Sequence, residues 1–315
     1  MSSRYAICYI GYKLKPFEEE CIASIAKNDP NHSYDAYAFI DNCGDEAESN
    51  KVKKVFLKYF PNASVIIRPG RFGEILNIVA SLNEIFSKGY EAIFYCENDI
   101  YFDETAFDTL VNLSQWARIH VPNAVVFTSW NYNLKYSEYP NEYNFYWYNH
   151  GLMNLNYSDA CTYEENEVGF TGQNHWGAFI LKRCWDAVAP YVNSHFQSFL
   201  NAKQISMAGF NLNNFISLLS KLTYVDTISN EFKHRTLSRF EISGFEPIYE
   251  TALIAHGLLR LCLTNPRSKS FEDPNSGLKY KLYCQCGLDK IHTLNSKNVP
   301  TEFVLNSKSK ELFTK

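Results

Sequence analysis

Residues 92–99 read AIFYCEND, and this stretch decides the fold. It opens with five apolar residues without a break, which is typical of a strand buried on both faces of a parallel sheet. Three polar residues, Glu97, Asn98 and Asp99, follow at once. Ligands of open α/β sheets bind beyond the carboxyl ends of the strands. The stretch therefore predicts a buried strand whose end carries two carboxylates at a place where a ligand binds.

The two carboxylates, Glu97 and Asp99, are two residues apart, so both side chains point to the same side of an extended chain. Carboxylate oxygens suit Mg²⁺ or Mn²⁺, which substrate phosphates also help to hold. The alternative for such a pair is a solvated turn at the end of a strand. The order of the surrounding elements favours the metal site.

Similar apolar runs recur along the chain, and helical patterns separate them. The runs predicted as strands are 5–10, 37–41, 64–67, 92–96, 124–128 and 177–181. The segments predicted as helices are 16–27, 46–60, 74–88, one from about Cys184, 211–221 and 247–263. Strands that alternate with helices form a mostly parallel sheet. We therefore expect an α/β fold with a mostly parallel sheet flanked by helices.

The composition becomes more polar near residue 265 and contains few apolar clusters beyond it. We expect one domain over 1–265, with a first half over 1–125 and a second half over 126–265. A polar C-terminal arm, helical or irregular, is expected over 266–315.

The overall composition excludes several classes of protein. Of the 315 residues, 46% are hydrophobic and 20% are charged, which excludes wholesale disorder. The net charge of −4 provides no general basic field for nucleic acid. No apolar run reaches the roughly 18 residues of a membrane span, so we expect no membrane span. The nine cysteines are scattered along the chain, which is typical of reduced thiols and not of a disulfide framework. Reduced thiols predict a cytoplasmic location, in a bacterium or in the host cell of a virus.

In order and spacing, four segments resemble those of the GT-A glycosyltransferases, in particular the family 2-like nucleotide-diphospho-sugar transferases. They are the strand over 5–11, the acidic turn over 37–45 (YAFIDNCGD), the helix start over 73–77 (GEILN), and 94–99 (FYCEND) as an Asp-x-Asp motif with Glu in first place. The resemblance covers about residues 4–130 and extends more loosely to about 240. It implies the GT-A, Rossmann-like fold, with the nucleotide sugar bound by 1–125 and the acceptor by 126–265.

The resemblance also implies a nucleoside diphosphate sugar as donor and Mn²⁺ or Mg²⁺ as cofactor. Asp99 would bind the metal that bridges the diphosphate, and Glu97 would hold the ribose or contribute to the metal shell. Asp41 would contact the base. The other positions implied to line the nucleotide pocket are Gly11, Tyr12, Arg71, Gly73, Asn77 and Asn98.

A second match lies near His234, which Ser238 follows four residues later. This pattern resembles the C-terminal histidine segment of the family, where an imidazole completes the metal shell or contacts the diphosphate. The alternative is a surface histidine between Lys233 and Arg235. Those two cations would also suit a diphosphate leaving group.

Aromatic residues, 16% of the chain, are concentrated between Phe127 and Tyr148, where ten of them occur. These rings either pack in a core or form a surface that stacks on a sugar or a base. By position in the family, the acceptor would meet this region and the segment before the strand over 177–181. The implied acceptor residues are Trp130, His175, Trp176 and Gly177.

The catalytic base that inverting members carry is missing from its expected place. Residues 187–225 contain no Asp or Glu, and an amide cannot remove the acceptor proton. Three explanations remain open: a base from Glu164, Glu165 or, as the weak candidate, Glu167; a retaining mechanism assisted by the leaving phosphate; or a chain that only binds. We favour the retaining mechanism.

The sequence thus predicts a metal-assisted hexosyl- or pentosyltransferase that moves a sugar to an acceptor hydroxyl. The acceptor is a glycan, a protein or a modified nucleobase, and the oligomeric state is unknown. The alternatives are a non-catalytic sugar-nucleotide binder and a phage-type glycosyltransferase that acts on a DNA base. A nucleotidyltransferase is disfavoured because the turn over 11–15 (GYKLK) is poor in glycine.

Overall fold

The computed structural model describes residues 4–129, 164–170, 177–202, 249, 252–253, 255–275 and 296–305. The chain divides into two compact units. The first comprises Met1–Leu14, Tyr34–Ile93 and Ile180–Leu259, and the second comprises Lys15–Ser33, Phe94–Phe179 and Arg260–Lys315. Within the described part of the chain, no helix combines the length and the apolar character that crossing a membrane requires.

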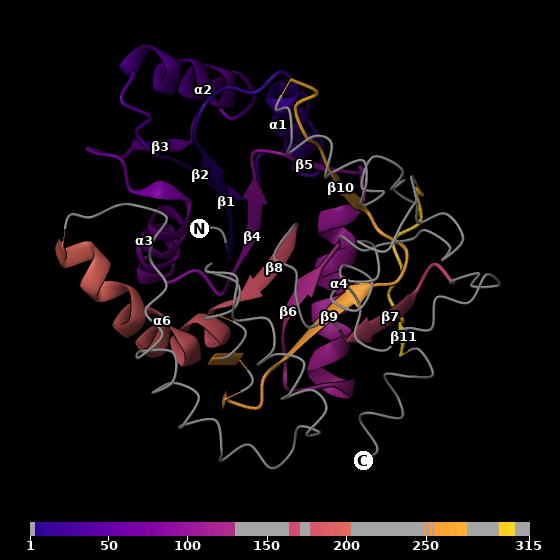
Figure 1. Ribbon diagram of the computed structural model, residues 1–315. Helices are drawn as coiled ribbons and strands as arrows, with labels where there is room; N and C mark the ends of the chain where they lie inside the picture. The colour runs from indigo at the N-terminus through magenta and orange to yellow at the C-terminus, as the bar shows by residue number, and fades with distance from the viewer. Residues whose placement is uncertain are drawn as a thin grey trace. The chain divides into compact units, whose positions relative to one another are not determined.

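The first unit is built on three parallel strands in the order β1-β2-β3 (Figure 1). They are β1 (Tyr5–Gly11), β2 (Asp35–Ile40) and β3 (Ser64–Ile67). Its helices are α2 (Glu46–Tyr59), α3 (Gly73–Ser87) and α6 (Lys182–Ala202). In β1, every residue after Tyr5 is buried, as the unbroken apolar sequence predicts for a covered parallel strand.

Alternate side chains of β1 face different helices. The Tyr9 ring packs against Phe56 of α2, with ring centroids 5.0 Å apart. Cys8 faces the opposite way, and its burial raises the pKa of its thiol, while the charge of Arg68 lowers it and that of Glu84 raises it. Because neighbouring residues of a strand point to opposite faces, helices cover both faces of this part of the sheet.

The remaining strands of the mainly parallel sheet lie wholly or partly in the second unit, in the order β11-β7-β9-β6-β8-β4. These are β4 (Ala92–Glu97), β6 (Ala124–Thr128), β7 (Glu167–Phe170), β8 (Ala178–Leu181), β9 (Leu259–Leu263) and β11 (Val304–Leu305). Strands β11 and β7 are parallel, whereas β7 and β9 are antiparallel. A separate antiparallel ribbon pairs β5 (Ile100–Phe102) with β10 (Ser268–Ser270).

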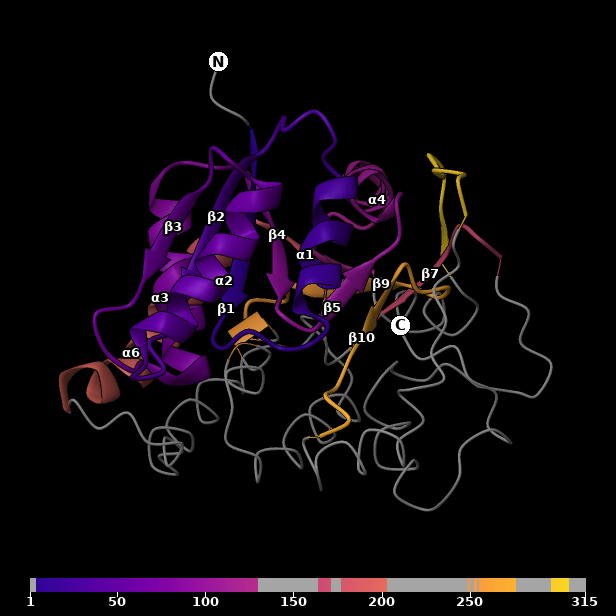
Figure 2. The ribbon, with the colours of Figure 1, turned by 90° about the horizontal axis from the view of Figure 1, so that it is seen from above.

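Two helices of the second unit, α1 (Glu18–Lys27) and α4 (Ala106–His120), are joined by one buried amide. The Asn28 side chain donates to the Asp103 carbonyl at 2.7 Å and accepts from the Phe107 N–H at 3.0 Å. Helix α1 packs against β5, and Figure 2 shows the two side by side. The end of α1 and the start of α4 are therefore fixed to the chain that follows β5.

The structure confirms the α/β fold with a mainly parallel sheet flanked by helices. Strands β3 and β6 have the bounds that the sequence predicts, and α2 begins at Glu46 as expected. Helix α4 and the short strands β5, β7, β10 and β11 were not predicted. The helix expected over 211–221 lies outside the described residues.

The helix predicted over 247–263 is wrong in its last part, where residues 259–263 form β9. Gly257 has a φ of 63°, a left-handed conformation that commonly ends a helix. The Leu258 N–H donates to the Leu253 carbonyl at 2.9 Å, which closes the helix end. The apolar residues that follow can then pair with β7 as a strand.

The division at residue 265 stays a prediction, because the two compact units follow other bounds. The described start of the expected polar arm belongs to the second unit. There, Arg267 and Ser268 are fully buried, and strand β10 lies within this stretch.

Candidate active site

Strand β4 delivers its acids to the surface of the second unit, as the sequence predicts. Residues 92–96 are buried, whereas Glu97, Asn98 and Asp99 are half-buried. The Tyr95 hydroxyl donates to Glu97 Oε1 at 2.8 Å. Tyr95, which lies two residues earlier on the same face of β4, thus orients the Glu97 carboxylate.

Asp99 lies in the turn between β4 and β5 and has a cation beside it. Lys15 Nζ lies 3.4 Å from Asp99 Oδ2, with side chains 27% and 21% exposed. The Asp99 carbonyl accepts from the Phe271 N–H at 2.7 Å, directly after β10. The backbone of Asp99 is therefore held by the β5–β10 ribbon, while its carboxylate remains partly in contact with solvent.

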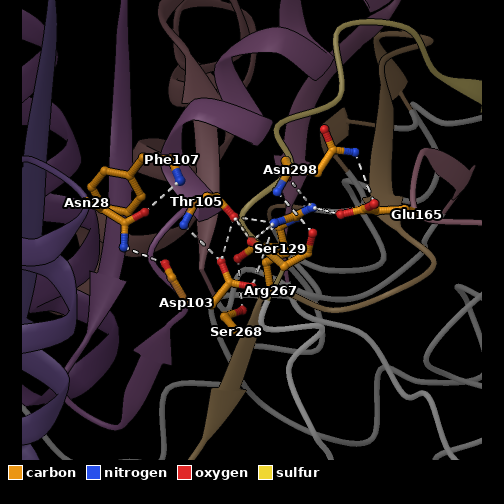
Figure 3. Close-up of polar contacts among 10 residues, drawn as sticks. Asn28, Asp103, Thr105, Phe107, Ser129, Glu165, Arg267, Ser268 and Asn298 are labelled. Atoms are coloured by element: carbon orange, nitrogen blue, oxygen red, sulfur yellow. Dashed lines mark hydrogen bonds and ion pairs between the residues drawn. The ribbon is translucent and has the colours of Figure 1, made fainter.

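A buried arginine holds this ribbon in place (Figure 3). The side chain of Arg267 is 0% exposed and donates to Glu165 Oε1 at 3.0 Å, to the Asn298 carbonyl at 3.0 Å and to Thr105 Oγ1. Its guanidinium also lies 3.9 Å from Asp103 Oδ2. We call Arg267 and these partners the Arg267 cluster. It joins four distant segments of the second unit.

The candidate base Glu165 belongs to this cluster. Partial burial raises the pKa of its carboxyl, but hydrogen bonds from Ser296 and Asn298 and the charge of Arg267 outweigh burial and lower it overall. A carboxylate bound in this way is a poor proton acceptor. Glu167, the weak candidate, is the first residue of β7, and its carbonyl accepts from the Thr264 hydroxyl at 2.9 Å.

In the first unit, Asp41 follows β2 and is 3% exposed. Its carboxylate accepts from the N–H groups of Phe72 at 2.7 Å and Gly73 at 2.9 Å, at the start of α3. Gly73 has a φ of 76°, which suits glycine at this turn. Asp41 therefore fixes the segment that carries Arg71, whose own side chain is exposed.

The side chain of Asn77, which was expected in the nucleotide pocket, is buried and hydrogen-bonded in the core of the first unit. Its Oδ1 accepts from Arg68 Nε at 2.8 Å, and its Nδ2 donates to the Phe39 carbonyl at 3.1 Å. Burial lowers the pKa of Arg68, although its pairing with Glu84 at 3.3 Å acts in the opposite direction. This buried arginine could not be predicted from the sequence, because it follows β3 where a solvated turn is expected.

Two other expected nucleotide positions lie near the end of β1. The Gly11 carbonyl accepts from the Asp41 N–H at 2.9 Å, so the ends of β1 and β2 are connected. Tyr12 is half-buried, and Lys13 Nζ lies 5.5 Å from its ring centroid. Gly11, Tyr12, Asp41, Arg71 and Gly73 thus form one group at the strand ends of the first unit.

Gly177 is the one expected acceptor residue that the structure describes. Its φ is 63°, and a Cβ atom there would lie 2.7 Å from Ser129 Oγ and 2.8 Å from Ser268 Oγ. Glycine is therefore required by packing at this position. Trp130, His175, Trp176 and His234 lie outside the described residues.

The acids at the end of β4 fit a divalent cation. Mg²⁺ and Mn²⁺ are commonly held by one or two carboxylates together with substrate phosphates, and Glu97 and Asp99 supply two half-buried carboxylates on neighbouring positions. No group of three or more His, Cys, Asp or Glu side chains suited to a metal occurs in the part of the chain that the structure describes. Substrate oxygens would have to complete such a shell.

No family model and no curated protein matches the chain. A solved structure of S. aureus TarS 1–349 is similar, with 12% identity over 59% of this chain and a TM-score of 0.36. A second structure of the same protein, in complex with UDP-GlcNAc, has 17% identity over 45% of this chain and a TM-score of 0.32. The chain covers 48% and 39% of those structures, less than half of each.

A mannosyltransferase from Pyrobaculum calidifontis, in complex with GDP-Man and Mn²⁺, is also similar. The identity is 14% over 81% of this chain and 69% of that structure, with a TM-score of 0.37.

Proposed function

We propose that the protein is a glycosyltransferase that takes its sugar from a nucleoside diphosphate sugar. The observation that carries the proposal is the end of β4, where five buried residues, 92–96, lead to the half-buried Glu97 and Asp99. This is where open α/β sheets bind ligands, and the half-buried acids there remain partly accessible to one. The order of strands and helices along the chain supports the same assignment.

In this proposal, Glu97 and Asp99 hold Mn²⁺ or Mg²⁺. The cation would neutralise the charge that develops on the departing diphosphate. The Tyr95 hydroxyl holds Glu97 at one oxygen, and the Phe271 N–H holds the backbone of Asp99. The two carboxylates are therefore positioned before any ligand binds, which reduces the entropy lost on binding.

The nucleotide is assigned to Gly11, Tyr12, Arg71, Gly73 and Asn98. Arg71 is exposed on a segment that the buried Asp41 carboxylate fixes. We assign Asp41 an indirect part in nucleotide binding, because its oxygens already accept from backbone N–H groups. Asn77 supports the same segment indirectly, through its hydrogen bonds to Arg68 and to the Phe39 carbonyl near the end of β2.

For the transfer itself, we propose a retaining mechanism with an acceptor hydroxyl. The pairing of Glu165 with Arg267 supports this mechanism, because a carboxylate that is paired with an arginine is a poor proton acceptor. The assignment of a hexose or pentose, and of Trp130, His175, Trp176 and His234 to the acceptor and the metal, remains a prediction from the sequence.

The experiment that tests the proposal is a thermal-shift panel of nucleoside diphosphate sugars with Mn²⁺. A donor that binds the native state raises the melting temperature as its concentration rises. We expect one donor to stabilise the protein only when Mn²⁺ is present, and Asp99→Asn to abolish this effect. Stabilisation by no member of the panel, in wild-type protein that binds Mn²⁺, would contradict the proposal.

A non-catalytic sugar-nucleotide binder is the second candidate. The observation that favours it is the ammonium group of Lys15 beside Asp99, because a cation is already present where a metal is proposed. Donor binding without any hydrolysis or transfer of the sugar, across a panel of hydroxyl acceptors, would support the binder.

A further inference from the structure

Lys15 places a cation beside the proposed metal site, within the second unit. Its Nζ lies 3.4 Å from Asp99 Oδ2, and both side chains are about one quarter exposed. Both charges are therefore partly removed from water, so that their attraction is stronger than that of a fully exposed pair. Lys15 lies before α1, far from Asp99 in sequence.

The fold holds Lys15 in this place. Its backbone N–H donates to Glu18 Oε2 at 2.9 Å, and the Glu18 N–H donates to the Lys15 carbonyl at 3.1 Å. Glu18 is 0% exposed, so this reciprocal pair is a fixed part of the start of α1. The lysine therefore projects from a rigid point.

The neighbouring aromatic residues connect Lys15 to the segment that holds Asp99. Lys15 Nζ lies 5.5 Å from the Phe17 ring centroid, and Phe17 stacks on Phe271 with centroids 5.5 Å apart. Phe271 in turn donates its N–H to the Asp99 carbonyl at 2.7 Å. The lysine and the aspartate are thus held by one continuous set of contacts.

We propose that Lys15 is a built-in counter-ion of Asp99, which a divalent cation displaces and which then binds the donor's diphosphate. The displacement needs only Asp99, Lys15 and the metal, whereas the diphosphate contact rests on the proposed function. An ammonium group and a divalent cation repel each other when both are close to one carboxylate. A diphosphate brings enough negative charge to bind both.

This arrangement makes metal and diphosphate binding cooperative. Without diphosphate, Lys15 competes with the metal for Asp99 and weakens metal binding. With diphosphate, the lysine moves to the phosphate oxygens and the competition ends. Because coupling between two ligands is reciprocal, the metal should strengthen diphosphate binding by the same factor.

The test measures Mn²⁺ binding to wild-type protein and to Lys15→Met, with and without inorganic pyrophosphate as a probe that carries no base or sugar. Without pyrophosphate, we expect Lys15→Met to bind Mn²⁺ about tenfold more tightly, because a repelling charge is removed. With saturating Mn²⁺, the same variant should bind pyrophosphate about tenfold more weakly, because it has lost an ammonium donor. Lys15→Arg, which keeps the charge, should resemble the wild type in both measurements.

The matched control is Lys27→Met, at the other end of α1. Lys27 Nζ lies 3.9 Å from Glu104 Oε1, and both side chains are more than half exposed. This variant loses the same charge from a lysine–carboxylate pair and should leave both affinities unchanged. Equal effects of Lys27→Met and Lys15→Met would show a general charge effect and overturn the proposal.

The outcomes separate this proposal from the proposed function. If Lys15→Met folds with the wild-type melting temperature but binds Mn²⁺ no more tightly, the counter-ion proposal is wrong, even when nucleotide sugars stabilise the protein. Tighter Mn²⁺ binding together with no stabilisation by any nucleotide sugar would support the counter-ion and contradict only the glycosyltransferase. If Lys15→Met does not fold, Lys15→Gln replaces it under the same criteria.

Discussion

At the scale of single residues, two acids that look alike in sequence have different environments. Asp41 and Asp99 both come shortly after a buried apolar run. Asp41 is 3% exposed and accepts from the N–H groups of Phe72 and Gly73, whereas the Asp99 side chain is 21% exposed and faces Lys15. The sequence could place both acids at strand ends. It could not separate their roles, because Phe72 and Gly73 reach Asp41 only in the folded chain.

Asp99→Asn should therefore change binding and leave stability nearly unaffected. The free energy of unfolding should stay within about 0.5 kcal/mol of wild type, as is usual for a substitution that keeps the shape of a partly exposed side chain. Mn²⁺ affinity in the presence of pyrophosphate should fall at least tenfold, or about 1.4 kcal/mol. Urea unfolding and calorimetric titration measure the two quantities. Unchanged Mn²⁺ affinity would remove Asp99 from the metal site.

Asp41→Ala should behave in the opposite way. It leaves two backbone N–H groups at the start of α3 without their charged acceptor, and each such hydrogen bond contributes about 1.5–3 kcal/mol. We expect a loss of at least about 2 kcal/mol in the free energy of unfolding, and weaker nucleotide binding with Mn²⁺ affinity largely kept. Asp186→Ala, at an exposed position of α6, is the control and should change stability little. A variant as stable as wild type would show that Asp41 does not hold this segment.

At the scale of secondary structure, the sequence predicts those elements that have a local cause. The apolar runs of β1, β3 and β6 and the capped start of α2, where Asp45 accepts from Ala47 and Glu48 N–H groups, all lie within one short segment. The ribbon of β5 and β10 could not be predicted in this way. Each of its strands has three residues, and the pairing joins parts of the chain that are far apart.

Arg267→Met tests the cluster that holds this ribbon. The variant leaves the buried Asp103 and the Glu165 carboxylate without their cation, and breaking a buried pair in this way costs about 3–5 kcal/mol. We expect a loss of that size in the free energy of unfolding. The control is Lys182→Met, which breaks an exposed pair with Asp186 in α6 and should cost less than about 0.5 kcal/mol. Similar losses in the two variants would mean that the cluster adds little.

The same cluster predicts a dependence of stability on pH. Since the pKa of Glu165 is lower in the folded than in the unfolded chain, its stabilising effect is complete above its unfolded value of about 4.3. The effect is lost as the pH falls from there through the folded pKa. Urea unfolding of wild-type protein and Glu165→Gln between pH 7 and pH 3 should therefore show a stability difference that shrinks with acid. A difference that is constant over this range would contradict the pairing.

At the scale of the whole molecule, the chain passes between its two compact units inside strands. Strand β4 has residues in both units, and so does β8, because the unit boundaries fall after Ile93 and after Phe179. A strand cannot unfold at one end without weakening its other end, so we expect the two units to unfold as one. Local sequence patterns carry no information on this coupling.

Thiol labelling can test the coupled unfolding. Burial raises the pKa of Cys8 in the first unit and of Cys262 in the second, so both thiols should react only when their surroundings open. With labelled sites located by mass spectrometry, the two cysteines should become reactive over the same range of urea concentration. Cys43, which is half-buried, should react without urea and serves as the control. Labelling of Cys8 well before Cys262 would show that the units unfold separately.

The Arg267 cluster can form only late in the synthesis of the chain. Thr105 and Asp103 leave the ribosome early, but the Asn298 carbonyl that completes the shell of Arg267 follows roughly 190 residues after Thr105. At translation rates of about 5–20 residues per second, that interval lasts on the order of 10–40 seconds. The strands β1, β2 and β3 and the helices between them have all emerged before it begins. A nascent chain stalled before residue 298 should therefore remain sensitive to protease, because the second unit lacks its last segment and the two units are expected to fold together.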